Sequence, residues 1–244
     1  MTTKKIVIGD ILNESWAIVK KNVWVFAATM LGYFIIYSLI YLLFGGIGAA
    51  TTAIAPGDSS AAMSQALTSM FSVGAILTWL LMTIISAFFY LGFYKMALDS
   101  ADGKNPDLSS FTSISMKKII NLFLANLIYG IVVYIGLIAC IIPGIFLAVR
   151  LQLYVFNIID HDANAFDALS RSWNSTKGNS MDIFLLGLAL VLVNFVGLIC
   201  CGIGLLVTMP ITIIAFALIY RLLTGGKVED VAFETITEDN EPVV

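Results

Sequence analysis

The chain has 244 residues, of which 59% are hydrophobic and 12% charged, and its mean hydropathy is +0.96. Water-soluble domains carry about 25% charged residues, so the composition excludes a protein that covers its whole surface with polar groups. The net charge of −3 comes largely from acidic residues after Lys227, and the chain has no basic patch of the kind that binds nucleic acid. We therefore expect membrane lipids, and no nucleic acid, as partners.

Charged residues and the single histidine are absent from four long runs, 22–57, 59–94, 119–149 and 183–220. Each run is long enough to cross a hydrocarbon core, which takes about 20 helical residues. Membrane β-strands alternate apolar and polar residues, whereas stretches such as Ile183–Val193 are almost uniformly apolar. Because a helix satisfies its own backbone hydrogen bonds in lipid, the sequence predicts an all-α, polytopic membrane protein.

Six transmembrane helices are predicted in one domain that covers residues 1–223. They span residues 23–44, 71–94, 119–142, 144–160, 181–201 and 204–223. Proline and glycine interrupt helices, so tight turns are expected at Pro143 with Gly144 and at residues 202–204. A longer connection, 45–70, joins the first two spans. Residues 224–244 are predicted to form an acidic cytoplasmic tail.

The basic residues predict the orientation of the chain. Twelve of the 13 Lys and Arg residues fall in the set of segments that includes both termini, and residues 45–70 and the two tight turns contain none. The positive-inside rule then places both termini in the cytoplasm. The exception is Arg150, which lies within a predicted span.

Short amphipathic helices are predicted before the first and the fifth span. Apolar residues share one face of each segment. They are Ile8, Ile11, Leu12, Trp16 and Val19 in the first, and Phe166, Leu169 and Trp173 in the second. We expect both helices at the cytoplasmic interface, with Trp16 and Trp173 at headgroup depth. They either close the cytoplasmic ends of the helix bundle or make specific contacts with lipid or a partner.

An internal repeat connects these segments. The pattern formed by Leu12, Ser15, Trp16, Lys20 and Asn22 recurs at Leu169, Ser172, Trp173, Lys177 and Asn179. A second similarity relates residues 136–142 to 197–203. The pattern predicts three helical-hairpin repeats, each preceded by a short interfacial helix, with residues 106–118 as a weaker middle copy.

Motifs for catalysis, nucleotide binding and metal coordination are absent from the sequence, so we expect no enzyme activity, no cofactor and no metal. Two groups of ionisable or reactive side chains remain. They are Asp160, His161, Asp162 and Asp167 at a membrane end, and Cys140, Cys200 and Cys201 near the outer ends of spans. The first group either binds a cation or caps helix ends. The sequence leaves two alternatives for the second group. Either Cys140 forms a disulfide with one of the other two cysteines, or all three are buried free thiols.

Polar residues within the spans come to a similar depth when counted from the outer turns. They are Tyr37, Thr78, Tyr134, Arg150, Asn194 and Thr212. Such a layer either lines a solvent-accessible cavity or fastens helices together by hydrogen bonds. Arg150, Tyr154 and Asn157 also share one face of their helix.

Arg150 is the strongest candidate for a ligand site. It follows Gly144 by six residues, which places it about 9 Å along the helix from the outer turn. A guanidinium that faced lipid there would cost about 3 kcal/mol, so we expect Arg150 to face the protein interior. Its expected partners are Asn194, Tyr134, Tyr37, backbone carbonyls near Pro143, water or a bound anion. Arg150, Asn194, Tyr134 and Tyr37 form the predicted ligand-binding site.

Four segments resemble a known group of bacterial inner-membrane proteins. They are GKNPDLSSF from Gly103, IIPGIFLAVRLQLYVFNIID from Ile141, ALSRSWNSTKGN from Ala168 and CGIGLLVTMPITIIAFALIYRLL from Cys201. This part of the chain, about residues 100–223, is similar to the uncharacterised YciC-type proteins and to the membrane domain fused to some glycerophosphoryl diester phosphodiesterases. The resemblance implies a multi-pass protein of the bacterial inner membrane. It assigns no functional residues, and the catalytic phosphodiesterase domain is missing here.

Two functions fit these observations. The first is a non-catalytic membrane protein that organises lipid or a membrane protein partner, supported by the interfacial helices and the lack of reactive groups. The alternative is a channel or carrier for a small solute, including an anionic one, supported by Arg150 and the polar layer. Broken spans and several intramembrane charges would favour transport, and only one such charge is found. The sequence indicates no oligomeric state.

Overall fold

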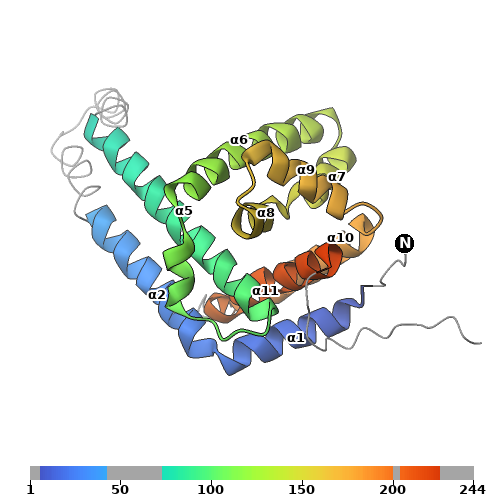
Figure 1. Ribbon diagram of the computed structural model, residues 1–244, viewed down its shortest axis with the longest axis horizontal. Coiled ribbons are helices and arrows are strands. Elements are labelled where there is room, and N and C mark those ends of the chain that lie inside the picture. The colour runs from blue at the N-terminus through green and yellow to red at the C-terminus, as the bar shows by residue number, and fades with distance from the viewer. Residues whose placement is uncertain (1–5, 43–72, 200–203, 226–244) are drawn as a thin grey trace, which may run out of the picture.

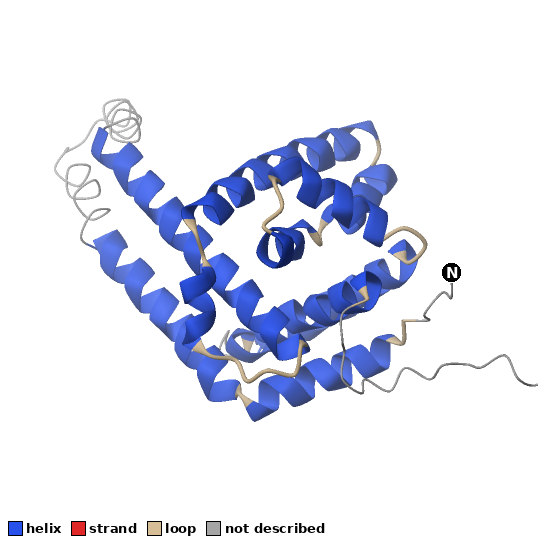
Figure 2. Ribbon diagram, in the orientation of Figure 1, coloured by secondary structure: helices blue, strands red, loops and turns tan. Residues whose placement is uncertain are grey.

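The computed structural model describes residues 6–42, 73–199 and 204–225, and every regular element among them is a helix (Figure 2). The helices are α1 (Ile8–Lys21), α2 (Val23–Ile40), α5 (Val73–Ala101), the 3-10 helix η2 (Leu108–Ser113), α6 (Met116–Ala139), α7 (Ile141–Leu151), α8 (Tyr154–His161), α9 (Ala165–Ser175), α10 (Ser180–Ile199) and α11 (Leu205–Thr224). The predicted connection 45–70, most of the turn at 202–204 and nearly all of the acidic tail lie outside the described residues.

Six helical segments are long and apolar enough to cross a membrane, which confirms the predicted fold class. These are α2, α5, α6, α7 with α8, α10 and α11. Their outer faces are apolar, since side chains such as Trp24 and Ile142 are 84% and 76% exposed. So many exposed large apolar side chains are found on proteins whose solvent is lipid.

The second span is longer than predicted. The helix was expected to end at residue 94, before Lys95, but α5 continues to Ala101. Lys95 Nζ lies 2.7 Å from Asp99 Oδ1, one helical turn further on. Because residues four apart lie on the same side of a helix, this ion pair lets the helix continue beyond its apolar part.

The predicted turn between the third and fourth spans is wrong by three residues. Cys140, exposed and with a free thiol, adopts an extended conformation between α6 and α7. Pro143 is the third residue of α7. Proline is tolerated there because backbone N–H groups of the first helical turn have no partner within the helix. Cys200 and Cys201 lie outside the described residues.

The fourth span follows α6 in the opposite direction over nearly its whole length. Gly144 lies against Gly136 near the turn, and Tyr154 donates a hydrogen bond to Asn126 midway along the helix. At the far end, Lys118 Nζ lies 3.1 Å from Asp162 Oδ1. The span therefore crosses as one unit, although it consists of two helices, α7 and α8.

Side chains of α9 stabilise the break between α7 and α8. Ser172 Oγ donates to the carbonyl of Arg150 at 3.0 Å and accepts from the N–H of Leu153 at 3.1 Å. Thr176 Oγ1 donates to the same carbonyl at 3.1 Å. These bonds satisfy backbone groups near the break, which would be costly to leave unpaired in a buried position.

Both predicted amphipathic helices form, but their buried faces differ from those expected. In α1, Ile11, Ser15 and Val19 are buried, while Trp16 is half-exposed at the edge of that face. In α9, Leu169 is buried and Phe166 is exposed. The expected middle copy, 106–118, contains the 3-10 helix η2 and the start of α6. The repeat itself stays a prediction.

The C-terminal ends of α5, α8 and α11 meet in an ionic cluster. Arg221 contacts Asp102 through Nε at 2.6 Å and Nη2 at 2.7 Å, and Asp160 through Nη1 at 2.8 Å. Tyr220 also donates to Asp160 at 3.1 Å. Asp160 and Asp162 of the predicted histidine cluster are thus held by Arg221 and Lys118. Among the described residues, no group of three or more His, Cys, Asp and Glu side chains is placed to hold a metal ion.

Candidate functional site

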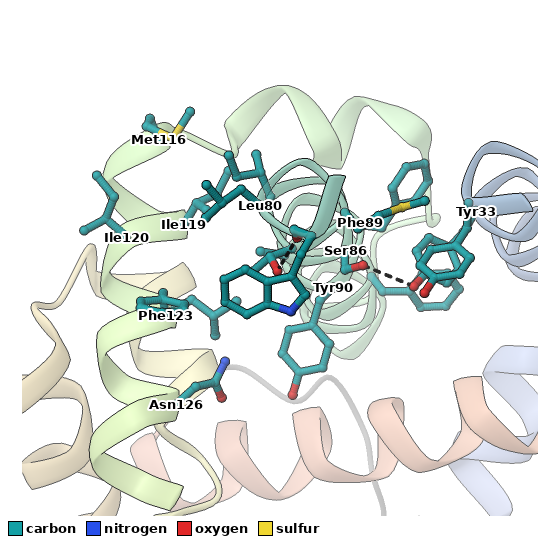
Figure 3. A pocket seen from close by; sticks show the side chains of 18 of the residues that line it. Tyr33, Leu80, Ser86, Phe89, Tyr90, Met116, Ile119, Ile120, Phe123 and Asn126 are labelled. Carbon is teal, nitrogen blue, oxygen red and sulfur yellow. Dashed lines mark hydrogen bonds between the residues drawn. The ribbon is translucent and has the colours of Figure 1, made fainter. Parts of the chain in front are cut away.

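Figure 1 shows α5 between α2 and α6. A large cavity is lined by side chains of these three helices (Figure 3). Its volume is about 980 Å³, at the upper end of the range of about 300–1,000 Å³ for small-molecule sites. Met209 and Ile213 of α11 also line it. We call this cavity the lateral cleft.

Aromatic and aliphatic side chains make up most of the wall of the lateral cleft. From α2 and α5 come Met30, Tyr33, Phe34, Tyr37, Trp79, Leu80, Met82, Thr83, Ile84, Ser86, Ala87, Phe89, Tyr90 and Phe93; from α6 come Met116, Ile119, Ile120, Leu122, Phe123, Leu124 and Asn126. None of these lining residues carries a charge. Trp79, Phe34 and Leu80 are also substantially exposed, so the cleft opens on the apolar surface of the protein.

A hydrogen bond between two side chains joins α2 to α5 across the cleft wall. Tyr33 Oη and Ser86 Oγ lie 3.4 Å apart, and the Tyr33 ring packs against Phe89 with 5.3 Å between ring centres. Figure 3 shows this pair on the α2 side, while Tyr90 and Asn126 lie toward the end of the cleft away from Met116. The cleft therefore has an apolar body and a polar end.

A second, smaller cavity adjoins that polar end. It measures about 140 Å³, and we call it the tyrosine pocket. Its walls are Tyr90, Tyr94, Tyr129, Gln152, Tyr154, Phe156 and Phe216. Tyr90 lines both cavities, and Asn126 of the lateral cleft accepts the hydrogen bond from Tyr154 of the pocket. The pocket lies at the break between α7 and α8, since Gln152 belongs to that break.

Arg150 faces the protein interior, as predicted, and is only 6% exposed. Its Nη2 donates to the carbonyl of Trp173 at 2.5 Å. The guanidinium carbon lies 4.0 Å from the centre of the Trp173 ring and 5.5 Å from that of Phe146. The partner of Arg150 is therefore Trp173 of α9, a helix that was expected at the membrane interface. Among the described interactions, none of the side chains predicted as partners of Arg150 contacts it. Cation–π contacts and one carbonyl hold the charge.

The other predicted site residues lie elsewhere. Asn194 Nδ2 donates to Thr212 Oγ1 at 2.7 Å and to the carbonyl of Leu190 at 2.9 Å, which fastens α10 to α11. Tyr134 is 66% exposed. Tyr37 lines the lateral cleft, whereas Arg150, Asn194 and Tyr134 line neither of the two cavities. The structure does not bring the four residues together, and a ligand-binding role for them stays a prediction.

Sequence analysis did not identify most of the residues that line the two cavities. Tyr90 and Tyr94 lie four apart on α5, and Tyr90 Oη donates to Tyr94 Oη at 3.0 Å. This spacing was the available signal, because it places two polar groups on one face of an apolar helix. The partners Tyr129 and Tyr154 come from two other helices, and no local pattern indicates which helices pack together.

Comparison with known proteins gives relatives of unknown function. The family described as "Domain of unknown function (DUF7847)" matches residues 108–236. The uncharacterized protein Rv2560 of Mycobacterium tuberculosis is 24% identical over 228 residues, which cover 91% of this chain and 70% of that protein. The uncharacterized protein Mb2590 of Mycobacterium bovis is 23% identical with the same coverage. No solved structure matches. These matches give no support for the resemblance to YciC-type proteins or to the phosphodiesterase membrane domain.

Proposed function

The chain belongs to the DUF7847 family, whose function is unknown. We propose that it is a non-catalytic, multi-pass membrane protein that organises lipid. The lipid chains occupy the lateral cleft between α2, α5 and α6. The observation that carries this proposal is a cleft of about 980 Å³ with no charged lining residue, open on an apolar surface.

The location of the protein is part of the proposal. Six apolar helical segments support a multi-pass topology. The one-sided distribution of Lys and Arg supports cytoplasmic N- and C-termini. The relatives are proteins of mycobacteria, which supports a bacterial inner membrane as the location. In that setting lipid chains are the molecules that meet the mouth of the lateral cleft.

Loose packing within the cleft supports occupation by lipid. Empty apolar space deprives its lining of dispersion contacts, and a chain of methylene groups would restore them. The Tyr33–Ser86 contact between α2 and α5 is long for a hydrogen bond between hydroxyl groups, at 3.4 Å. A weak bond of this kind allows the cleft wall to adapt to chains of different shape.

A carrier for a small solute is the second candidate. It is favoured by the break in the fourth span at Gln152 and Leu153, beside the buried Arg150. Broken helices at mid-membrane form the binding sites of many transporters. Here, however, Ser172 and Thr176 satisfy backbone groups at the break, and Trp173 covers the guanidinium. The break therefore has a structural explanation without a solute.

Native mass spectrometry of the full chain tests the proposal. Thr83→Phe with Ala87→Phe adds bulk inside the cleft, and Gly130→Phe adds bulk at an open position on α6 where a Cβ meets nothing within 4 Å. We expect the parent and the Gly130 variant to retain lipid through detergent exchange and the double variant to lose it. Size-exclusion chromatography checks that each variant is monodisperse.

Equal lipid retention in the monodisperse double variant and the parent would contradict the proposal. Uptake of a solute by vesicles containing the parent, abolished by Arg150→Leu, would instead support the carrier.

A further inference from the structure

The tyrosine pocket offers hydrogen-bond donors that the protein itself does not use. Tyr90 donates to Tyr94, and Tyr154 donates to Asn126. Neither Tyr94 nor Tyr129 donates its own hydroxyl proton to an acceptor within the described residues, although both line the pocket. A hydroxyl that faces a cavity without an acceptor is suited to an oxygen atom of a ligand.

The pocket extends from the charged end of α5 into the membrane-spanning part of the fold. Tyr94 directly precedes Lys95, the first charged residue of α5, and Tyr90 lies about 6 Å further into the span at 1.5 Å per residue. Tyr129 is 13 residues into α6 from Met116, or about 20 Å. Since a hydrocarbon core is about 30 Å thick, Tyr129 lies well inside it and Tyr94 lies near its charged edge.

A charged ligand would have no counter-charge there. Neither cavity is lined by a charged side chain among the described residues, and the Arg150 guanidinium is covered by Trp173 and Phe146. Placing an ion in such surroundings is far more costly than placing a neutral group with hydrogen-bond acceptors. For a neutral polar group, hydrogen bonds to the tyrosine hydroxyls and the amide of Gln152 would offset the cost of burial.

Size points to a compact polar head. The pocket of about 140 Å³ is close to an engineered cavity of about 150 Å³ that binds one benzene molecule. A glycerol unit or a single quinone ring has this scale. Because Tyr90 lines both cavities, a ligand head in the pocket would lie next to the end of the lateral cleft.

From these observations we infer that the tyrosine pocket binds the head of an uncharged lipid that presents oxygen acceptors, while its hydrocarbon chain lies in the lateral cleft. This inference rests on the proposed function and names the lipid class. Diacylglycerols and polyprenyl quinones share the required chemistry, namely acceptor oxygens in a head without any charged group. Phospholipids lack it, because their phosphate is ionised even where an ammonium group balances the net charge.

Binding to the full-length protein in delipidated detergent solution tests the inference. The probes are dioleoylglycerol, a decyl-substituted benzoquinone and dioleoylphosphatidylglycerol, each titrated separately by native mass spectrometry. The triple variant Tyr90→Phe, Tyr94→Phe, Tyr129→Phe removes the two unused donors together with the hydroxyl of Tyr90, which would lose its acceptor at Tyr94, and keeps the rings. Tyr134→Phe is the control on the exposed surface of α6. We expect at least one neutral probe to bind more tightly than phosphatidylglycerol.

The triple Phe variant should bind that probe about tenfold more weakly, the effect of losing two ordinary hydrogen bonds, and the Tyr134 variant should match the parent. Preference for the glycerol or the quinone probe identifies the source of the head. A preference for phosphatidylglycerol, or full neutral-lipid affinity in the triple Phe variant, would overturn the inference and leave lipid retention in the cleft intact. Unchanged neutral-lipid binding in the Thr83→Phe, Ala87→Phe variant would contradict the proposed cleft instead.

Discussion

The hairpins α6–α7 and α2–α5 show two ways to place neighbouring apolar helices. Between α6 and α7, Gly136 and Gly144 bring the backbones into contact, and a Cβ built on Gly136 would lie 3.0 Å from the Cα of Gly144. Between α2 and α5, large rings such as Tyr33 and Phe89 contact each other and line the lateral cleft. Small residues allow helix backbones to approach closely in lipid, whereas large rings stand between α2 and α5.

Polar contacts reinforce the same difference. The α6–α7–α8 pair is fastened by the hydrogen bond between Tyr154 and Asn126 and by the ion pair between Lys118 and Asp162. The α2–α5 pair has the longer contact between Tyr33 and Ser86, at 3.4 Å. The closed hairpin thus has a structural role, and the open one forms the wall of the lateral cleft.

The largest effect is expected from Gly144→Leu. A Cβ at Gly144 would lie 2.6 Å from the backbone nitrogen of Leu137, so the backbones must separate. Overpacking of this severity should destabilise the protein by about 3 kcal/mol, measured by unfolding in mixed detergent and SDS. Gly32→Leu in α2, where a Cβ meets nothing within 4 Å, is the control and should change stability by less than about 0.5 kcal/mol. Equal losses in both variants would remove the distinction between the hairpins.

Ser172→Ala should have the next largest effect. It leaves the N–H of Leu153 without its hydroxyl partner and removes one of two hydroxyl donors to the Arg150 carbonyl. We expect a loss of about 2 kcal/mol in the same unfolding assay, the usual cost of a buried unpaired polar group. Ser175→Ala is matched on the same helix, since its hydroxyl bonds only a carbonyl of α9, and should lose little. Similar values for the two variants would show that α9 does not stabilise the break.

Arg150→Leu should preserve membrane insertion and reduce stability by about 1.5 kcal/mol, through loss of the Trp173 carbonyl bond and the cation–π contacts. Lipid retention should be unchanged, because Arg150 lines neither cavity. Arg171→Leu, at an exposed position of α9, is the matched control. If the Arg150 variant lost bound lipid and the Arg171 variant did not, Arg150 would be part of the ligand-binding site after all.

Asn194→Leu should produce the smallest change, about 0.6 kcal/mol, which is typical of a hydrogen bond between membrane helices. A double-mutant cycle with Thr212→Val isolates the pair, since it subtracts the effect of each side chain alone. Zero coupling in that cycle would show that the bond does not fasten α10 to α11.

The helices were predictable from the sequence because charge-free apolar runs have one stable arrangement in lipid. The ends of the helices were harder to predict. Lys95 was taken as the end of a span, but it pairs with Asp99 and α5 continues past both residues. The interior position of Arg150 followed from the cost of exposing a charge to lipid. Its partner did not, because the helix of Trp173 was expected at the membrane interface.

The cavities could not be predicted, because they depend on contacts between distant parts of the chain. Tyr33 and Ser86 are 53 residues apart, and Asn126 and Tyr154 are 28 apart. Side-chain spacing within one helix indicates which face is polar, but not which helix covers that face. Gly144 was expected to break a helix, whereas in the structure it provides close contact between two.

Site-specific photo-crosslinking in native membranes tests the lipid cleft most directly. Benzoylphenylalanine replaces Phe34, which lines the lateral cleft and is 52% exposed, or Leu192, which lines neither cavity and is 62% exposed. Similar exposure means that accessibility alone predicts similar capture at the two positions. We expect position 34 to capture a restricted lipid class, enriched in uncharged lipid, and position 192 to capture lipids in proportion to the bulk membrane. Capture of the bulk composition at both positions would contradict the account.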